Sequence, residues 1–158
     1  MRISDDTLAI ILHWTWGFFQ NFCGLCAAII FRQKNWHRYK NAIVTHYRSN
    51  SKMRRKGYFA CGMWIFTDPE LPEETYNKIL SHEYGHTVQS MILGPFFPLL
   101  VGLPSMLGFH LFTYRKKHPK PMKSDASAGK TRLYSSHYPE AQANRIGEKK
   151  TGMKAIDW

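Results

Sequence analysis

The sequence is poor in acidic residues and in cysteine. Only 11 residues are Asp or Glu against 22 Lys and Arg, which gives a formal net charge of +11 over 158 residues. Three cysteines are an odd number in a short chain, so a framework of disulfides is excluded. Cys23 and Cys26 are spaced C-x-x-C, but they stand within an apolar segment, where cysteine behaves as a small hydrophobic residue.

The basic excess indicates an anionic partner, either nucleic acid or lipid. The positive charges follow long apolar runs, in segments that begin at Arg32, Lys52 and Tyr114. A nucleic-acid module more often spreads Lys and Arg over one soluble face, with exposed aromatic residues between them. We therefore expect the lipid bilayer, and no nucleic acid, as a partner, while the oligomeric state is not indicated.

The N-terminus lacks the pattern of a cleaved signal peptide. "MRISDDT" has no clear basic region, and no small-residue cleavage site follows the apolar stretch. Residues 8–31 are therefore expected to be retained as a transmembrane helix, since a span needs about 20 mostly apolar residues. The polar residues His13, Gln20 and Asn21 within it should face protein.

A second apolar run, residues 95–114, is rich in Gly and Pro. We expect a break at Gly94–Pro95 and a returning helix that forms a helical hairpin with the preceding one. Basic segments follow both apolar runs, so the positive-inside rule places these ends in the cytoplasm. The expected location is the bacterial inner membrane, with the site near its cytoplasmic face.

The remaining segments complete a mainly α, membrane-associated fold, expected as one domain over residues 1–158. β-Branched and aromatic residues predict strands at 42–47 and 58–66, which would form a β-hairpin over 42–66. A helix is predicted over 72–93, with Pro72 in its first turn. A polar linker over 115–133 precedes a short helix over 138–147, which Gly147 would end.

The segment "LSHEYGHTVQS" carries the clearest chemical pattern. His82 and His86 lie four residues apart and so share one face of a helix, as two ligands of a zinc ion would. Glu83 follows the first histidine and completes the H-E-x-x-H arrangement, in which the glutamate is the general base. Gln89 lies one turn beyond His86 and could orient a ligand or the substrate.

A catalytic zinc needs a third protein ligand. Glu140, in "YPEAQANRIG", is our choice, with Asn144 one turn further along the same face as a hydrogen-bond partner for a ligand histidine. His137 is the nearest rival, and it could instead stabilise an oxyanion. The other candidates considered for this position are His46, His110, His118 and Asp125.

The segments "HEYGHTVQS", "GPFFPLLVGLPS" and "YPEAQANRIG" resemble a group of small bacterial membrane-associated proteins regarded as zinc metallopeptidases. The resemblance covers about residues 57–147, with a gap in the linker, and the spacing is similar to that of gluzincins. It implies that His82, His86 and Glu140 bind Zn²⁺ and that Glu83 is the base. Asn144 stands where many members of the group carry Asp.

The resemblance also implies a protein or peptide substrate that pairs with an edge strand beside the metal-binding helix. Residues 58–66 occupy that place, and Gly62 would let a substrate backbone approach closely. A strand that only packs in the core is the alternative. The expected function is a membrane-bound zinc metallopeptidase. The alternative is a non-catalytic membrane protein with a structural metal site or an adaptor role, in which His137 could be a fourth ligand.

Overall fold

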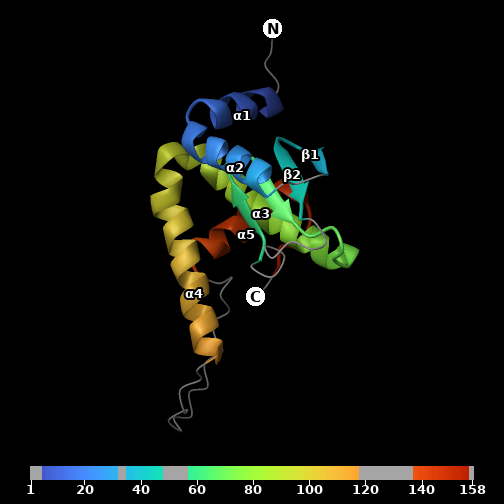
Figure 1. Cartoon of the computed structure of the whole chain (residues 1–158), viewed down its shortest axis with the longest axis vertical. Helices are drawn as coiled ribbons and strands as arrows, with labels where there is room; N and C mark the ends of the chain where they lie inside the picture. Colours follow the sequence, from blue (N-terminus) through green and yellow to red (C-terminus); the bar gives the residue numbers. More distant parts are fainter. Residues whose placement is uncertain (1–4, 32–34, 48–56, 118–136, 157–158) are drawn as a thin grey trace.

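The fold is a small mixed sheet enclosed by helices. The computed structural model describes residues 5–31, 35–47, 57–117 and 137–156, without the side chains of 112–117. Figure 1 shows two helices at one end of the molecule, a long central helix, and a further helix that extends along one side. The helices are α1 (Asp5–Trp14), α2 (Phe18–Ile30), α3 (Glu73–Leu93), α4 (Leu103–Lys117) and α5 (Glu140–Thr151).

The sheet has four short strands in the order β1-β2-β4-β3. The central pair, β2 and β4, is parallel, and each central strand pairs with an antiparallel neighbour. The single β-hairpin predicted over residues 42–66 is therefore wrong. The two predicted strands lie side by side in parallel, and each belongs to a separate hairpin. The strands are β1 (Trp36–Tyr39), β2 (Ala42–His46), β3 (Phe59–Cys61) and β4 (Trp64–Thr67).

The central strands β2 and β4 are buried on both faces, and their side chains alternate between the two. Val44 and Ile65 face α3, where they pack in one core cluster with Leu80. Trp64 and Phe66 point to the other face and form a second cluster against α2. The sheet thus lies between α2 and α3 and holds α3, the helix of the H-E-x-x-H motif, along one of its faces.

The transmembrane helix predicted over residues 8–31 is wrong. The segment forms two helices, because the chain turns at residues 15–17, and Gly17 is the N-cap residue of α2. Within the described part of the chain, no helix combines the length and apolarity that a membrane crossing needs. The predicted cytoplasmic orientation assumed this crossing and stays a prediction.

The polar residues of this segment do face protein, as predicted. His13, Gln20 and Asn21 are all buried. The Gln20 amide donates to the carbonyl of Gly94 at 2.8 Å, and the Asn21 side-chain oxygen accepts from the Met63 amide at 3.2 Å. These bonds join α2 to the end of α3 and to the sheet.

The predicted helical hairpin is also corrected. After Leu93 the chain forms two short irregular turns, Gly94–Phe96 (η2) and Pro98–Gly102 (η3), before α4 begins. The main partner of α3 is α5 rather than α4. α4 extends to Lys117 and so includes the start of the predicted linker, whereas residues 118–133 lie outside the described residues.

Candidate metal centre

The crossing of α3 and α5 positions the candidate site. A Cβ atom added at Gly85 would overlap the carbonyl of Ala143, and one added at Gly147 would overlap the carbonyl of Ser81. The two glycines therefore let the backbones approach closely, one from each helix. Gly147 lies within α5 and does not end it, which corrects the predicted boundary: the helix continues to Thr151 and Gly152 follows it.

Three side chains that were predicted as ligands meet at this crossing. One Glu140 carboxylate oxygen, Oε2, lies 3.1 Å from His82 Nε2 and 3.4 Å from His86 Nε2. The imidazole rings are perpendicular, with centroids 4.8 Å apart. One ligand atom from each residue lies within 4.8 Å of the other two, so the group could hold a metal ion. The exposed fractions are 3% for His82, 7% for His86 and 2% for Glu140.

The second nitrogen of each imidazole is fixed by an amide side chain. His82 Nδ1 lies 2.6 Å from the Asn144 oxygen, and Asn144 donates its nitrogen to the Ile156 carbonyl. His86 Nδ1 lies 2.8 Å from the Gln89 oxygen, and the Gln89 nitrogen donates to the side-chain oxygen of Gln142 at 2.9 Å. Both amide oxygens are thus acceptors, which places a proton on each Nδ1 and directs each Nε2 at the cluster.

The electrostatics of the group favour a cation beside Glu140. Burial alone would raise the pKa of this carboxyl group, but hydrogen bonds with His82 and His86 outweigh it and hold the pKa well below its usual range. Burial likewise lowers the pKa of His82, and the hydrogen bond to Glu140, the charge of Glu83 and the hydrogen bond to Asn144 reverse this, so the pKa rises to about 9. The carboxylate is therefore ionised and takes its stabilisation from positive neighbours.

Glu83 lies next to the group but takes no part in it. Its side chain is buried, and its Oε2 atom has no hydrogen-bond partner among the residues that the structure describes. Burial raises the pKa of Glu83, while the nearby charges of His82 and His86 lower it. A buried carboxylate oxygen without a partner is costly unless water or an ion meets it.

The donor set therefore fits a divalent metal ion. Two imidazole nitrogens and one carboxylate oxygen suit zinc, and other first-row metals accept the same ligands. The geometry establishes a possible metal-binding group and leaves the identity of the metal open.

The other predicted site residues lie away from the cluster. His137 is exposed just before α5, outside the group of three. Gly62 lies in the turn between β3 and β4, and its open side is filled by the backbone of Asn21, so the close approach predicted there is made by α2. Among the rivals for the third position, His46 bonds to Tyr76 at 3.1 Å and His110 is exposed on α4. His118 and Asp125 lie outside the described residues.

Sequence reasoning missed the residues that support the ligands from a distance. Gln142 and the Ile156 carbonyl complete the two amide relays, and Ser105 of α4 is a further hydrogen-bond partner of Glu140. The sequence does not indicate these contacts, because Gln142, Ile156 and Ser105 lie in different segments of the chain. The two glycines at the helix crossing could have been noticed, since a glycine inside a helix often marks a close approach.

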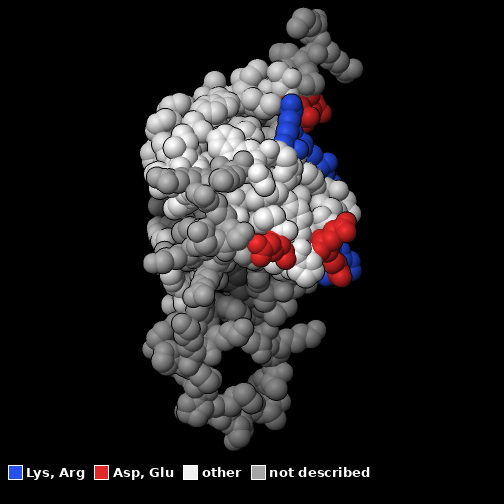
Figure 2. All heavy atoms as spheres, turned by 45° about the vertical axis from the view of Figure 1, so that its right-hand side comes forward, with Lys and Arg blue, Asp and Glu red and all other residues white. Residues whose placement is uncertain are grey.

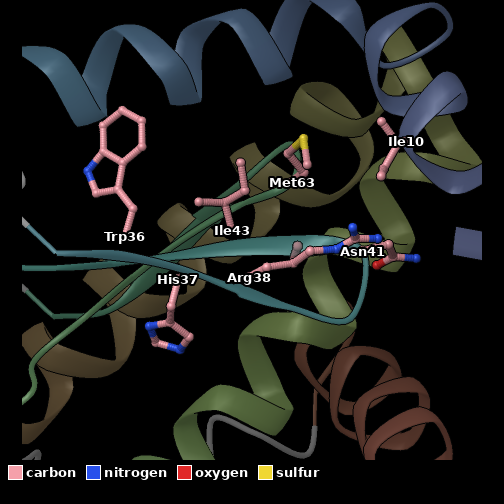
Figure 3. A pocket seen from close by; sticks show the side chains of 8 residues that line it. Ile10, Trp36, His37, Arg38, Asn41, Ile43 and Met63 are labelled. Atoms are coloured by element: carbon pink, nitrogen blue, oxygen red, sulfur yellow. The ribbon is translucent and has the colours of Figure 1, made fainter. Parts of the chain in front are cut away.

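A cavity of about 330 Å³ lies elsewhere, between α1 and the first two strands. Figure 3 shows Trp36, Ile43 and Met63 on the same side of the sheet within it. His82, His86 and Glu140 do not line this cavity. It therefore gives no information about a substrate at the metal group.

Comparison with known proteins adds no assignment. No protein-family model matches the chain, and no significant match was found among curated proteins or solved structures. The function is therefore argued from the metal group and its surroundings.

Proposed function

We propose that the chain is a zinc-dependent metallopeptidase in which His82, His86 and Glu140 hold the metal. The observation that supports this most strongly is the convergence of three buried ligands from two helices, with both imidazoles oriented by amide partners. A structural site could share these features. The additional carboxylate of Glu83, buried beside the ligands with an oxygen that no described residue meets, favours catalysis.

Each residue has a separate role in the proposal. A zinc ion in such a site polarises a carbonyl group and lowers the pKa of water toward about 7. Glu83 accepts the proton of the attacking water and then passes it to the leaving amine. Burial raises the pKa of Glu83 above its usual value, which makes this carboxylate a stronger base than an exposed glutamate.

A peptide substrate is supported by the edge of the sheet next to α3. Among the described residues β3 is an outer strand that pairs only with β4, and it contacts both α2 and α3. An extended peptide can add to such an edge through main-chain hydrogen bonds, with little demand on its sequence. Binding of this kind favours a polypeptide substrate over a small molecule.

The burial of the ligands favours a second candidate, a structural metal site. All three are less than one-tenth exposed. A structural site is closed by four ligands, whereas a catalytic one keeps a position open. Binding of a hydroxamate separates the two, because this inhibitor needs an open position on the metal.

The test compares peptide hydrolysis and metal content in three variants of the full chain. Glu83→Gln should retain the metal and lower hydrolysis of a fluorogenic peptide library by roughly 10²–10⁴-fold. His82→Ala should lose both properties. Glu73→Gln, an exposed carboxylate on the same helix, is the matched control and should lose neither.

Two outcomes would contradict the proposal. Full hydrolysis by Glu83→Gln would remove the assigned base. A wild-type chain that binds zinc but neither cleaves peptides nor binds a hydroxamate would support the structural site.

A further inference from the structure

The structure exposes a large apolar surface that the metal group does not explain. We define the apolar face as the exposed large apolar side chains of residues 8–30, from α1 to the end of α2, together with those of residues 92–111. Ile30 is 71% exposed and Leu99 is 64% exposed, and Phe19 and Ile92 are similarly open. Monomeric soluble proteins rarely expose apolar patches of more than a few hundred Å², so a face of this kind marks an interaction site.

The two parts of the apolar face form one surface. The Trp16 ring packs edge-on against Phe96, with centroids 6.3 Å apart. The Trp16 indole also donates to the carbonyl of Ile92 at 3.2 Å. Figure 1 shows α1 and α2 beside the turn that leads into α4. A single partner can therefore cover both parts.

α4 is apolar around most of its circumference. Among its described side chains, only Ser105 and His110 are polar. Ser105 faces the body of the protein, while Leu103, Leu107 and Leu111 recur on the exposed side. A helix of this composition is not stable against water and requires an apolar neighbour.

Much of the described surface carries no charged side chain (Figure 2). On the side drawn in Figure 2, the charged side chains of the described residues gather along one edge, and most of the remaining described surface is uncharged. Residues 7–31 and 84–111 contain no Asp, Glu, Lys or Arg, so a neighbour of the apolar face meets few charges that it must desolvate.

Apart from Asp5 and Asp6 at the start of α1, the sequence around the apolar face is basic and without acidic residues. No Asp or Glu occurs over residues 7–67 or over residues 84–124. α4 ends with Arg115, Lys116 and Lys117, and Arg32 and Lys34 follow α2 in the sequence. Basic residues at the ends of apolar helices complement the anionic head groups of lipids, which attract Lys and Arg near the membrane surface.

We infer that the apolar face docks the chain in the plane of an anionic lipid bilayer, without crossing it. The apolar side chains enter the boundary between head groups and acyl chains, as in other helices that lie in this interface. Trp14 and Trp16 belong to the residue type that prefers this depth. A second copy of the chain would cover the apolar side chains equally well, but it would gain nothing from the basic excess and would bring like charges together.

The inference does not depend on catalysis and can be tested with lipid alone. The full chain is mixed with phosphatidylcholine vesicles, with and without phosphatidylglycerol, and its co-flotation is measured. Wild type should bind the anionic vesicles more strongly. Leu103→Lys with Leu107→Lys should reduce binding to both vesicle types by at least about tenfold, because lysine is costly in the acyl region. Glu73→Lys makes the same change in net charge at an exposed position in the first turn of α3 and should not reduce binding.

A second pair of variants tests the charge. Lys116→Gln with Lys117→Gln should weaken binding to the anionic vesicles by about tenfold or more. Lys149→Gln with Lys150→Gln, in the last turn of α5, is the matched control and should leave binding nearly unchanged. The inference is overturned if wild type stays with neither vesicle, or if the leucine variants bind as wild type does. It is also overturned if those variants abolish a dimer that forms without lipid binding.

Discussion

At the scale of the residue, two missing Cβ atoms allow the ligands to meet. Glu140 reaches the imidazoles because α3 and α5 are in backbone contact at Gly85 and Gly147. Gly85 lies between His82 and His86 in the sequence, so the glycine of "HEYGH" is placed to bring α5 against the metal-binding turn. The distances of 3.1 and 3.4 Å to Glu140 depend on this contact.

Substitution of Gly85 should therefore disturb stability and metal binding together. A Cβ atom in Gly85→Ala would overlap the Ala143 carbonyl and push α5 away. We expect the free energy of unfolding to fall by about 1–3 kcal/mol, which is typical of overpacking. Urea unfolding and zinc titration of the full chain measure the two effects.

Gly102→Ala is the matched control, because its Cβ would meet only the Phe97 carbonyl at 3.9 Å. It should leave the zinc affinity unchanged. Equal stability and equal zinc affinity in Gly85→Ala would show that the helix contact does not set the site.

At the scale of the element, the break between α1 and α2 turns three polar residues inward. The apolar run is continuous in hydropathy, so the sequence favoured one long span. The structure instead gives α2 a protein partner on its polar side, where Gln20 and Asn21 bond to the end of α3 and to the sheet. His13 in α1 is buried as well, and its Nδ1 atom has no hydrogen-bond partner among the described residues.

His13 should make stability depend on pH. Burial lowers its pKa from 6.5 to about 4, so the unfolded chain binds the proton more readily than the folded one. The stability that neutral His13 allows is fully present above pH 6.5 and is lost as the pH falls toward 4, because protonation then favours the unfolded chain. A shift of this size corresponds to about 3 kcal/mol of the free energy of unfolding.

Replacement of His13 by leucine should remove this part of the acid sensitivity. Urea unfolding of the metal-free chain between pH 7 and pH 4 measures it. His110→Gln, at an exposed position on α4, is the control and should keep the wild-type slope. A slope in His13→Leu equal to that of wild type would show that His13 does not cause the effect.

At the scale of the whole molecule, the sequence predicted the residues of the possible metal-binding group better than the architecture. The spacing of His82, Glu83 and His86 requires only one helix, so local pattern was sufficient. Glu140 was chosen from its place in a predicted helix with Asn144 one turn further along, and the resemblance implied the same residue. The group of three in the structure includes it.

The architecture depends on pairings that a local pattern does not contain. "WHRY" reads as part of a basic segment, yet it forms the outer strand β1. β2 and β4 pair in parallel, and β1 and β3 each supply an antiparallel neighbour. Hydropathy also does not say whether an apolar helix meets lipid or protein, and α2 meets the sheet on one side and is open on the other.

The central claim is that His82, His86 and Glu140 bind one metal ion. Metal analysis of the purified full chain, wild type beside Glu140→Ala, tests it most directly, with the exposed Glu73→Ala as control. We predict about one zinc ion per chain in wild type and control, and an affinity lowered by more than about 100-fold in Glu140→Ala. A wild-type chain that takes up no metal from a zinc-containing buffer, or a Glu140→Ala chain that binds it equally well, would contradict the account.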